Sequence, residues 1–291
     1  MRKMVLGQKN AVDVYSALES CFIKPGMRDR WAGEMAAVQD FLTETYATRG
    51  MGLVCDFTPR IKKVYTAVFA SREAMEKVLA KEETEILLFV HHPKGWDLTK
   101  ADEFPPMDRG LLEEFRRKKI SIFNLHVPLD VNGPYSTSVT LARAIGMRPE
   151  GGFFDYYGGP AGVIGRTQCT TADGLLRALE SAIGHRARLY PYGGRKIRDG
   201  AVGVIAGGGN TIQAHEELVR KGINVLVTGV TVENEFSRAA HESARKNKIS
   251  LIGGTHYSTE AFACRAMCGF FTNKLGLRAE FVEEKPGMED L

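Results

Sequence analysis

The sequence has few cysteines, no long hydrophobic run and almost no excess of one charge, and each absence excludes a class of protein. Its five cysteines form no CxxC pair, which argues against a disulfide framework and favours a reduced, cytoplasmic protein. No apolar run approaches the ~20 residues that span a bilayer, and the segment up to Lys24 lacks the apolar stretch of a signal peptide. A formal net charge of +4 is too small to indicate nucleic-acid binding.

What remains is the composition of an ordinary globular protein. Hydrophobic residues make up 44% of the 291 positions and charged residues 25%, which excludes disordered, collagen-like and coiled-coil classes. At about 150 residues per domain, the length indicates roughly two domains. A chain this long buries about 75% of the surface that its unfolded form exposes, so it needs no disulfide or structural metal to fold.

Strand-like apolar runs alternate with amphipathic, helix-like segments along the chain. The predicted strands are Val64–Ala70, Ile86–Val90, Ile120–Leu125, Ala187–Tyr190, Ala201–Ala206, Ile223–Thr228 and Ile249–Ile252. The predicted helices are Val12–Phe22, Arg30–Thr45, Ser71–Ala80, Met107–Lys119, Ser136–Ile145, Thr211–Lys221, Val232–Lys246 and Glu260–Leu275. This alternation predicts an α/β protein with largely parallel sheets that are covered by helices.

Glycine and proline interrupt this pattern in the middle of the chain. Residues 150–162 are interpreted as a linker or binding loop, because a run so rich in glycine is not expected to form a regular element. We therefore expect a domain junction there. A second boundary is expected near Lys248, before the last predicted strand.

Four of the seven histidines lie in three short segments, each at the end of a predicted strand. The first segment contains His91 and His92, followed by Pro93, which cannot extend a central strand. Neighbouring side chains within a strand point to opposite faces. The two histidines can therefore share a site only where the strand has ended.

The second segment contains His126 and Asp130. Pro128 lies between them and is expected to keep both residues on a loop that leaves a strand. Ligands of parallel α/β sheets bind where the carboxyl ends of the strands meet. We therefore expect this segment to lie beside the first.

The third segment follows two glycines and contains His256 and Glu260. Ser258 or Thr259 is expected to cap the following helix, which places Glu260 in its first turn. This arrangement brings an imidazole and a carboxylate together at a further strand end.

Together the three segments have the composition of a divalent-metal site. A site of imidazole and carboxylate ligands suits Zn, Fe, Mn or Co rather than Ca. Mg is kept as a further candidate, and the pattern does not identify the metal. A catalytic site uses about three protein ligands per metal, so five ligands serve two ions if one carboxylate bridges them. The candidate ligands are His91, His92, Asp130, His256 and the candidate bridge Glu260.

The remaining histidines are given lesser roles. His126 is interpreted either as a sixth ligand or as a residue that supports the ligands. His185, His215 and His241 lie among charged residues in or beside predicted helices, and we interpret them as surface histidines.

Glycine-rich loops raise the question of a phosphate site. Gly207, Gly208 and Gly209 follow a predicted strand and precede a helix, where backbone amides can hold a phosphate. Arg195 and Lys196 add positive charge on another loop. The pattern is neither GxGxxG nor a Walker loop, so a tight strand-to-helix turn and solvated basic residues are the alternative interpretation.

The three metal segments resemble those of the NIF-three-like family of dinuclear metal-centre proteins. This family includes the bacterial YbgI proteins, and its members are also called GTP cyclohydrolase type 2 homologues. The matching pieces are His91-His92-Pro93, His126-Val-Pro-Leu-Asp130 and Gly254-Thr-His256-Tyr-Ser-Thr-Glu260. The family's usual Trp-Asp-Asn-x-Gly-Leu stretch is represented only by Arg49-Gly-Met-Gly-Leu53.

The resemblance implies a particular architecture. It implies two three-layer α/β domains with mixed, mostly parallel sheets, and two divalent ions in the cleft between the domains. Residues 1–148 with 249–291 would form the ligand-bearing domain and 149–248 an inserted one. It also implies a homo-hexameric ring.

The resemblance also implies a function. The protein would be a metal-dependent hydrolase of GTP cyclohydrolase type, which opens the guanine ring of its nucleotide substrate and releases formate. The candidate ligands do not specify guanine, and they would equally suit hydrolysis of a phosphoester or an amide. The alternative is a non-enzymatic, metal-binding or regulatory oligomeric protein.

Overall fold

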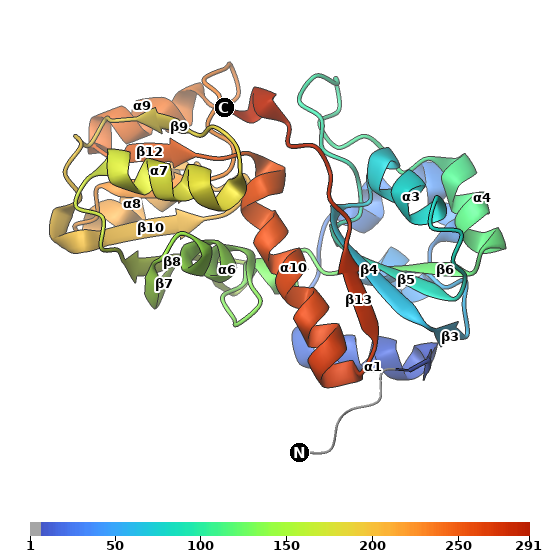
Figure 1. The fold of residues 1–291 in the computed structure, drawn as a ribbon. Helices are drawn as coiled ribbons and strands as arrows, with labels where there is room; N and C mark the ends of the chain where they lie inside the picture. Colours follow the sequence, from blue (N-terminus) through green and yellow to red (C-terminus); the bar gives the residue numbers. More distant parts are fainter. Residues whose placement is uncertain (1–6) are drawn as a thin grey trace, which may run out of the picture. The chain divides into compact units, whose positions relative to one another are not determined.

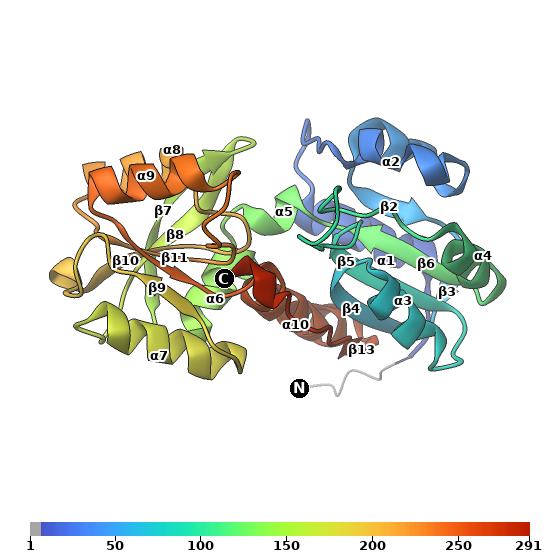
Figure 2. The ribbon, with the colours of Figure 1, turned by 90° about the horizontal axis from the view of Figure 1, so that it is seen from above.

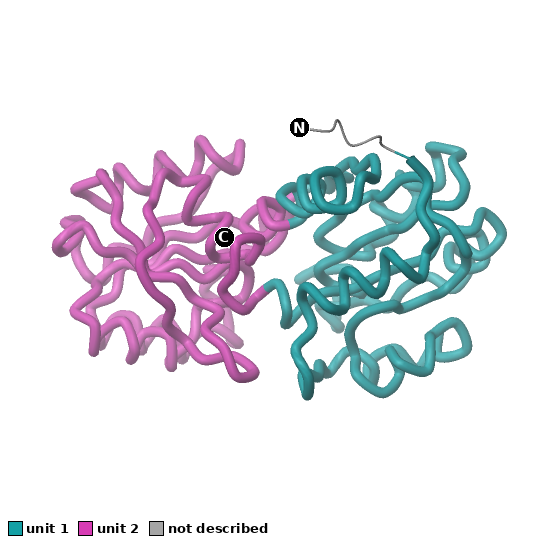
Figure 3. Tube along the Cα trace, turned by 90° about the horizontal axis from the view of Figure 1, so that it is seen from below, with its two compact units in different colours: residues 1–129, 264–285 teal, residues 130–263, 286–291 magenta. Residues whose placement is uncertain are grey.

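The computed structural model describes residues 7–291, which form two compact units (Figures 1 and 3). Unit 1 contains the described residues up to Leu129 together with Cys264–Lys285. Unit 2 contains Asp130–Ala263 and Pro286–Leu291. Each unit has its own sheet and core.

The sheet of unit 1 has five strands in the order β13-β4-β5-β6-β2. The strands are β2 (Gly52–Cys55), β4 (Lys63–Phe69), β5 (Ile86–His92), β6 (Ile120–Asn124) and β13 (Arg278–Phe281). The β13–β4, β4–β5 and β5–β6 pairs are parallel, and β2 is antiparallel to β6. A small antiparallel pair, β1 (Lys9–Asn10) with β3 (Arg60–Ile61), lies outside this sheet.

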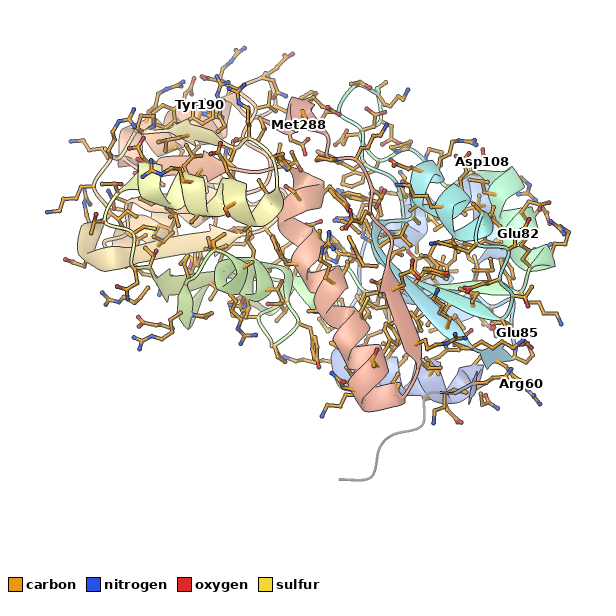
Figure 4. The ribbon with its side chains drawn as sticks, in the orientation of Figure 1. Arg60, Glu82, Glu85, Asp108, Tyr190 and Met288 are labelled. Atoms are coloured by element: carbon orange, nitrogen blue, oxygen red, sulfur yellow. The ribbon has the colours of Figure 1, made fainter. Side chains whose placement is uncertain are left out.

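Helices cover both faces of this sheet. Helix α1 (Ala11–Phe22) and the second half of α10 (His256–Leu275) cover one face, where Tyr15 stacks on Phe123 and Phe271 packs edge-on against Phe89. Helices α3 (Arg72–Leu79) and α4 (Arg109–Arg117) pack against each other and contact β4 and β6. Asp108, labelled in Figure 4, caps α4 by accepting a hydrogen bond from the Leu111 amide at 3.0 Å.

The sheet of unit 2 has six strands in the order β7-β8-β10-β11-β12-β9. They are β7 (Arg148–Tyr156), β8 (Gly159–Arg166), β9 (Arg188–Tyr190), β10 (Ala201–Ile205), β11 (Val225–Thr228) and β12 (Ser250–Gly253). The central β10, β11 and β12 are parallel to one another, and the outer pairings are antiparallel.

Helices again cover both faces. Helices α6 (Thr137–Ala144) and α7 (Ala172–Ile183) bury apolar side chains in one core cluster. Helices α8 (Ile212–Arg220) and α9 (Arg238–Asn247) bury theirs in another. Figure 2 shows α8 and α9 on one side of the sheet and α7 on the other. The predicted fold class, α/β with mixed and largely parallel sheets, is thereby confirmed.

Two local predictions are wrong. The glycine-rich stretch 150–162 is not a linker, because it forms the antiparallel hairpin of β7 and β8. The helix predicted over Arg30–Thr45 is replaced by the short 3-10 turns η1 (Trp31–Glu34) and η2 (Ala36–Phe41), and a helix, α2 (Glu44–Arg49), begins only at its end. Helix α7 was not anticipated.

The observed units differ from the expected domains at both boundaries. Strands β7 and β8 pair with β10 through β8, and α6 packs on them, so residues from Asp130 onward belong to unit 2. Strand β12 pairs with β11 and therefore also belongs to unit 2. Only the second half of α10 and β13 return to unit 1. No helix in residues 7–291 has the length and hydrophobicity needed to cross a membrane.

Candidate metal centre

Three histidines of unit 1 lie together at the carboxyl ends of β5 and β6. His91 and His92 are the last residues of β5, and His126 follows β6 by two positions. Their ring centroids are 4.4 Å apart for His91–His92, 5.1 Å for His91–His126 and 4.7 Å for His92–His126. One ring nitrogen of each lies within 4.8 Å of the others. We call these three residues the histidine cluster.

Hydrogen bonds fix two of these rings. His91 Nδ1 lies 2.9 Å from the Leu125 carbonyl oxygen. Because a carbonyl oxygen only accepts, Nδ1 must carry the proton, and the lone pair of the neutral ring lies on Nε2. Asn124 also holds this segment, because its side-chain amide donates to the His91 carbonyl. The ring is thus oriented for a cation at Nε2.

His126 is held by a carboxylate that lies far away in the sequence. Its Nδ1 lies 2.8 Å from Asp29 Oδ2, and the Asp29 side chain is 1% exposed. Burial alone would raise the pKa of Asp29. The hydrogen bond and the electrostatic interaction with His126, together with the amides of Arg30 and Val127, outweigh burial and hold this pKa below its ordinary value.

Aromatic rings enclose the histidine cluster. Trp31, which is fully buried, contacts His92 and His126 edge-on, with centroid distances of 5.7 and 5.3 Å. Phe69 and Phe104 stack on His92 at 4.9 and 5.7 Å. These rings exclude water and lower the local dielectric, which strengthens any interaction between the imidazoles and a cation.

Unit 2 carries a second group of ligand-type residues at the start of α10. His256 and Glu260 are 4% and 3% exposed, and His256 Nε2 lies 3.3 Å from Glu260 Oε1. We call them the α10 pair. Thr255 caps the helix by accepting a hydrogen bond from the Ser258 amide at 3.1 Å. The prediction that Ser258 or Thr259 is the cap is therefore wrong, because the helix begins earlier, at His256.

Two further contacts hold the α10 pair. Asp290, which is fully buried, accepts a hydrogen bond from the His256 amide at 2.7 Å and places a negative charge at the helix N-terminus. Gly207, with φ of +63°, lies so close to the pair that a Cβ atom there would overlap Glu260 Oε1. The Gly207 amide donates to Thr259 Oγ1 at 3.0 Å.

Asp130 also belongs to unit 2. It ends the single-turn helix α5 (Val127–Asp130), so the segment around Pro128 is not the loop that was expected. Proline is well tolerated in a first helical turn, where its missing N–H is not needed. Asp130 is half-buried, and its Oδ1 accepts a hydrogen bond from Thr137 Oγ1 at 3.3 Å.

The residues considered for phosphate binding do not come together. The loop that contains Arg195 and Lys196 contacts Asn224, just before β11 begins. Gly207 instead contacts Gly229 and Val230, just after β11 ends. The two basic residues and the glycine turn Gly207–Gly209 therefore lie at opposite ends of the sheet of unit 2. Arg195 is paired with Asp173.

The surface assignment of two other histidines is wrong. His215 and His241 are fully buried between α8 and α9. Burial lowers the pKa of His215 to about 4. His215 Nε2 donates to Asn210 Oδ1 at 3.0 Å, because an amide oxygen only accepts. Charged residues flank both histidines in the sequence, but they lie on the exposed faces of the two helices, whereas the histidines lie on the buried faces. His185 is half-buried and hydrogen-bonded to the Arg186 carbonyl.

Two supporting residues were missed altogether. Asp29 lies 97 positions from His126, and Asp290 lies 34 from His256. Neither stands in a recognisable motif. Only the three-dimensional arrangement assigns them a role.

The fold and these buried side chains define an α/β protein with a candidate metal centre. The family model of Duf34/NIF3 (NGG1p interacting factor 3) matches residues 36–286, and the chain belongs to that family. A protein of Archaeoglobus fulgidus named GTP cyclohydrolase 1 type 2 homolog is 26% identical over 232 residues, which cover 80% of this chain and 88% of that protein. A protein of the same name from Treponema pallidum is 24% identical over 282 residues, covering 85% and 94%.

Solved structures share the fold. Protein ybgI, described as of unknown function, superposes with a TM-score of 0.73 at 18% identity, covering 96% of this chain and 100% of that one. Reduced HcgD from Methanocaldococcus jannaschii superposes with a TM-score of 0.68 at 17% identity, covering 95% and 99%. The comparisons thus agree with the family assignment and the fold.

Proposed function

We propose that the protein is a hydrolase that uses two divalent metal ions. The ligands would be His91, His92, Asp130, His256 and Glu260, with His126 beside them. The histidine cluster and the α10 pair would serve the same two ions, because neither group alone supplies about three ligands for each. The observation that best supports the proposal is burial. The three residues of the histidine cluster and the two of the α10 pair are each at most 9% exposed.

The donor chemistry fits a divalent transition metal. Buried imidazoles are costly to leave charged, whereas a neutral ring with its proton fixed on Nδ1 offers Nε2 to a cation. The carboxylates of Asp130 and Glu260 would offset the repulsion between two dications. Divalent ions, when bound, supply Lewis acidity and lower the pKa of water toward neutrality.

The chain itself holds and orients these ligands. Leu125 and Asp29 fix the rings of His91 and His126, and Asp290 fixes the backbone of His256. The aromatic rings around His92 exclude bulk water, which favours electrostatic stabilisation of developing charge. These contacts suit hydrolytic chemistry, because its reacting groups must be held in place as charge develops.

The reaction that we propose is ring opening of GTP. Water adds to C8 of the guanine imidazole, the ring opens, and hydrolysis of the resulting formamide releases C8 as formate. Support for this substrate comes from the relatives named GTP cyclohydrolase 1 type 2 homolog. The resemblance to the NIF-three-like family adds the expectation of a homo-hexamer.

The first test is metal analysis of protein purified without chelator. We expect two ions per chain. His92→Ala should release one ion, because His92 is not the proposed bridge. Glu260→Gln should release both ions if the two groups of ligands share them, whereas independent sites would leave one behind. His185→Ala is the matched control, because this histidine lies outside both groups, and it should retain both ions.

The second test is turnover. The metal-loaded protein is incubated with GTP and a panel of nucleotides, and formate is measured. Formate from GTP that is lost in His92→Ala and kept in His185→Ala supports the hydrolase. Bound metal without turnover of any nucleotide favours a non-enzymatic metal-binding protein, and the absence of metal refutes the proposal.

A further inference from the structure

Asp29 precedes the residues that the family model matches. The family model begins at residue 36, whereas Asp29 precedes the turn η1 that carries Trp31. Its side chain is nevertheless almost completely buried, at 1% exposure, and meets His126. The contact therefore joins the N-terminal part of the chain to the segment that follows β6.

A buried carboxylate is costly unless donors and positive charge surround it. Asp29 Oδ1 accepts from the Arg30 amide at 2.7 Å, and Oδ2 accepts from His126 Nδ1 at 2.8 Å and from the Val127 amide at 3.4 Å. Two of these donors are consecutive residues at the exit of β6. The carboxylate thus holds both the ring and the backbone of the His126 segment.

The backbone of Asp29 is itself fixed. Its amide donates to the Arg49 carbonyl at 2.9 Å. Gly50, in the left-handed conformation with φ of +76°, lies against it so closely that a Cβ atom would overlap the Asp29 carbonyl oxygen. Asp29 is therefore a rigid partner rather than a side chain that swings to meet the histidine.

The hydrogen bond determines the tautomer. An ionised carboxylate only accepts, so His126 Nδ1 must donate, and in the neutral ring the lone pair lies on Nε2. His91 has the same arrangement through the Leu125 carbonyl. A ring nitrogen of each member of the histidine cluster lies within 4.8 Å of the others.

We propose that Asp29 is a positioning residue that fixes His126 in the Nδ1–H tautomer and so makes it a third imidazole ligand of unit 1. This inference rests on the proposed function only in that a cation is bound. It resolves the two roles that the sequence left open for His126 in favour of a ligand. The cation would be of the class that prefers imidazole, such as Zn or Co.

The first experiment measures the tautomer in metal-free protein. Two-bond ¹H–¹⁵N correlation spectra of the histidine rings distinguish Nδ1–H from Nε2–H. We expect Nδ1–H for His126 in the unaltered chain and a shift toward Nε2–H in Asp29→Ala. Asp29→Asn keeps the shape and an acceptor oxygen, and serves as the second variant if Asp29→Ala does not fold by circular dichroism.

The second experiment measures affinity by competition titration with Zn²⁺ and by the visible spectrum of Co²⁺. Loss of an outer hydrogen-bond partner of a ligand typically weakens metal binding about 10–100-fold, which we expect for Asp29→Ala. Asp40→Asn is the matched control, because Asp40 lies in the same segment but is exposed and paired with Arg109. It should bind as the unaltered chain does.

A double-mutant cycle separates positioning from general damage. If Asp29 acts through His126, then Asp29→Ala combined with His126→Ala binds no more weakly than His126→Ala alone, and both change the Co²⁺ spectrum alike. An unchanged His126 tautomer in Asp29→Ala, or additive losses in the cycle, would overturn the inference. A chain that binds no ion refutes the proposed function and the ligand role of His126, whereas the tautomer result still decides what Asp29 does.

Discussion

Replacing Gly207 by alanine should displace Glu260 while leaving the fold of unit 2 intact. Gly207 has φ of +63°, and a Cβ atom there would overlap Glu260 Oε1 and lie 3.0 Å from its Cδ and 3.1 Å from His256 Cδ2. The atom that must move is the end of a flexible side chain. The substitution therefore acts on the α10 pair more than on the backbone.

The substitution should change two quantities, the free energy of unfolding and the affinity for metal. A residue with a Cβ in the left-handed region costs about 1–2 kcal/mol, which lowers the midpoint of thermal unfolding by a few degrees. Loss of an outer hydrogen-bond partner of a ligand typically lowers metal affinity about 10–100-fold. Displacement of a ligand itself should lower it by at least as much, so we expect a loss of at least about tenfold. Calorimetry and Zn²⁺ titration measure the two quantities separately.

Gly208 provides the matched control. It lies in the same turn, its φ is not positive, and a Cβ atom there would meet no atom within 4 Å. Gly208→Ala should therefore leave both stability and affinity almost unchanged. The reasoning is refuted if Gly207→Ala binds metal as tightly as the unaltered chain, or if Gly208→Ala loses as much.

Three further predictions concern the site, the assembly and the core. Glu260→Gln should release both ions and Asp130→Asn only one, because the proposed bridge would contact both ions. Metal stoichiometry measures this, and the reverse order would show that Asp130 is the bridge. Light scattering should give six times the chain mass of 32.1 kDa, and a monomer at micromolar concentration would contradict the hexamer. The pKa of His215 is lowered to about 4 in the folded state. Between pH ~6.5 and ~4 the unfolded chain therefore takes up a proton that the folded chain does not. The free energy of unfolding should fall by up to roughly 3 kcal/mol as the pH decreases through this range. Denaturant unfolding of the unaltered chain and of His215→Gln at pH 7 and pH 5 measures this, and an equal pH dependence of the two would contradict it.

Most of the strands that sequence patterns predicted are buried on both faces, and the edge strand β9 is the exception. Every one of the seven predicted strands corresponds to an observed strand, because continuous apolar runs mark the interior of a helix-covered sheet. The β7–β8 hairpin is not predicted from the sequence, because a run so rich in glycine is expected to interrupt regular elements. Several of its glycines instead make room: a Cβ atom at Gly152 would clash with Pro160, and one at Gly162 with Phe153. Such close packing across strands is not visible in a local pattern.

The failed helix prediction has a different cause. Trp31, Met35, Val38 and Phe41 are all buried and spaced like the apolar stripe of a helix, yet Val38 has non-helical backbone angles and the segment folds as two 3-10 turns. Tertiary contacts at both ends of η1 compete with the helix: Asp29 binds His126, and Glu34 lies 3.5 Å from Lys94, two positions after His92. Local propensity is weak enough for such contacts to override it.

The same reasoning separates the predictable part of the candidate site from the rest. Ligand candidates such as His91 and Glu260 stand in short motifs, because the residues of one strand end or one helix turn must be neighbours in sequence. Asp29 and Asp290 do not, because a single carboxylate needs only to arrive at the right place, from any part of the chain. The motifs therefore predict the ligand candidates and contain a supporting neighbour such as Leu125, whereas Asp29 and Asp290 are found only from the folded structure.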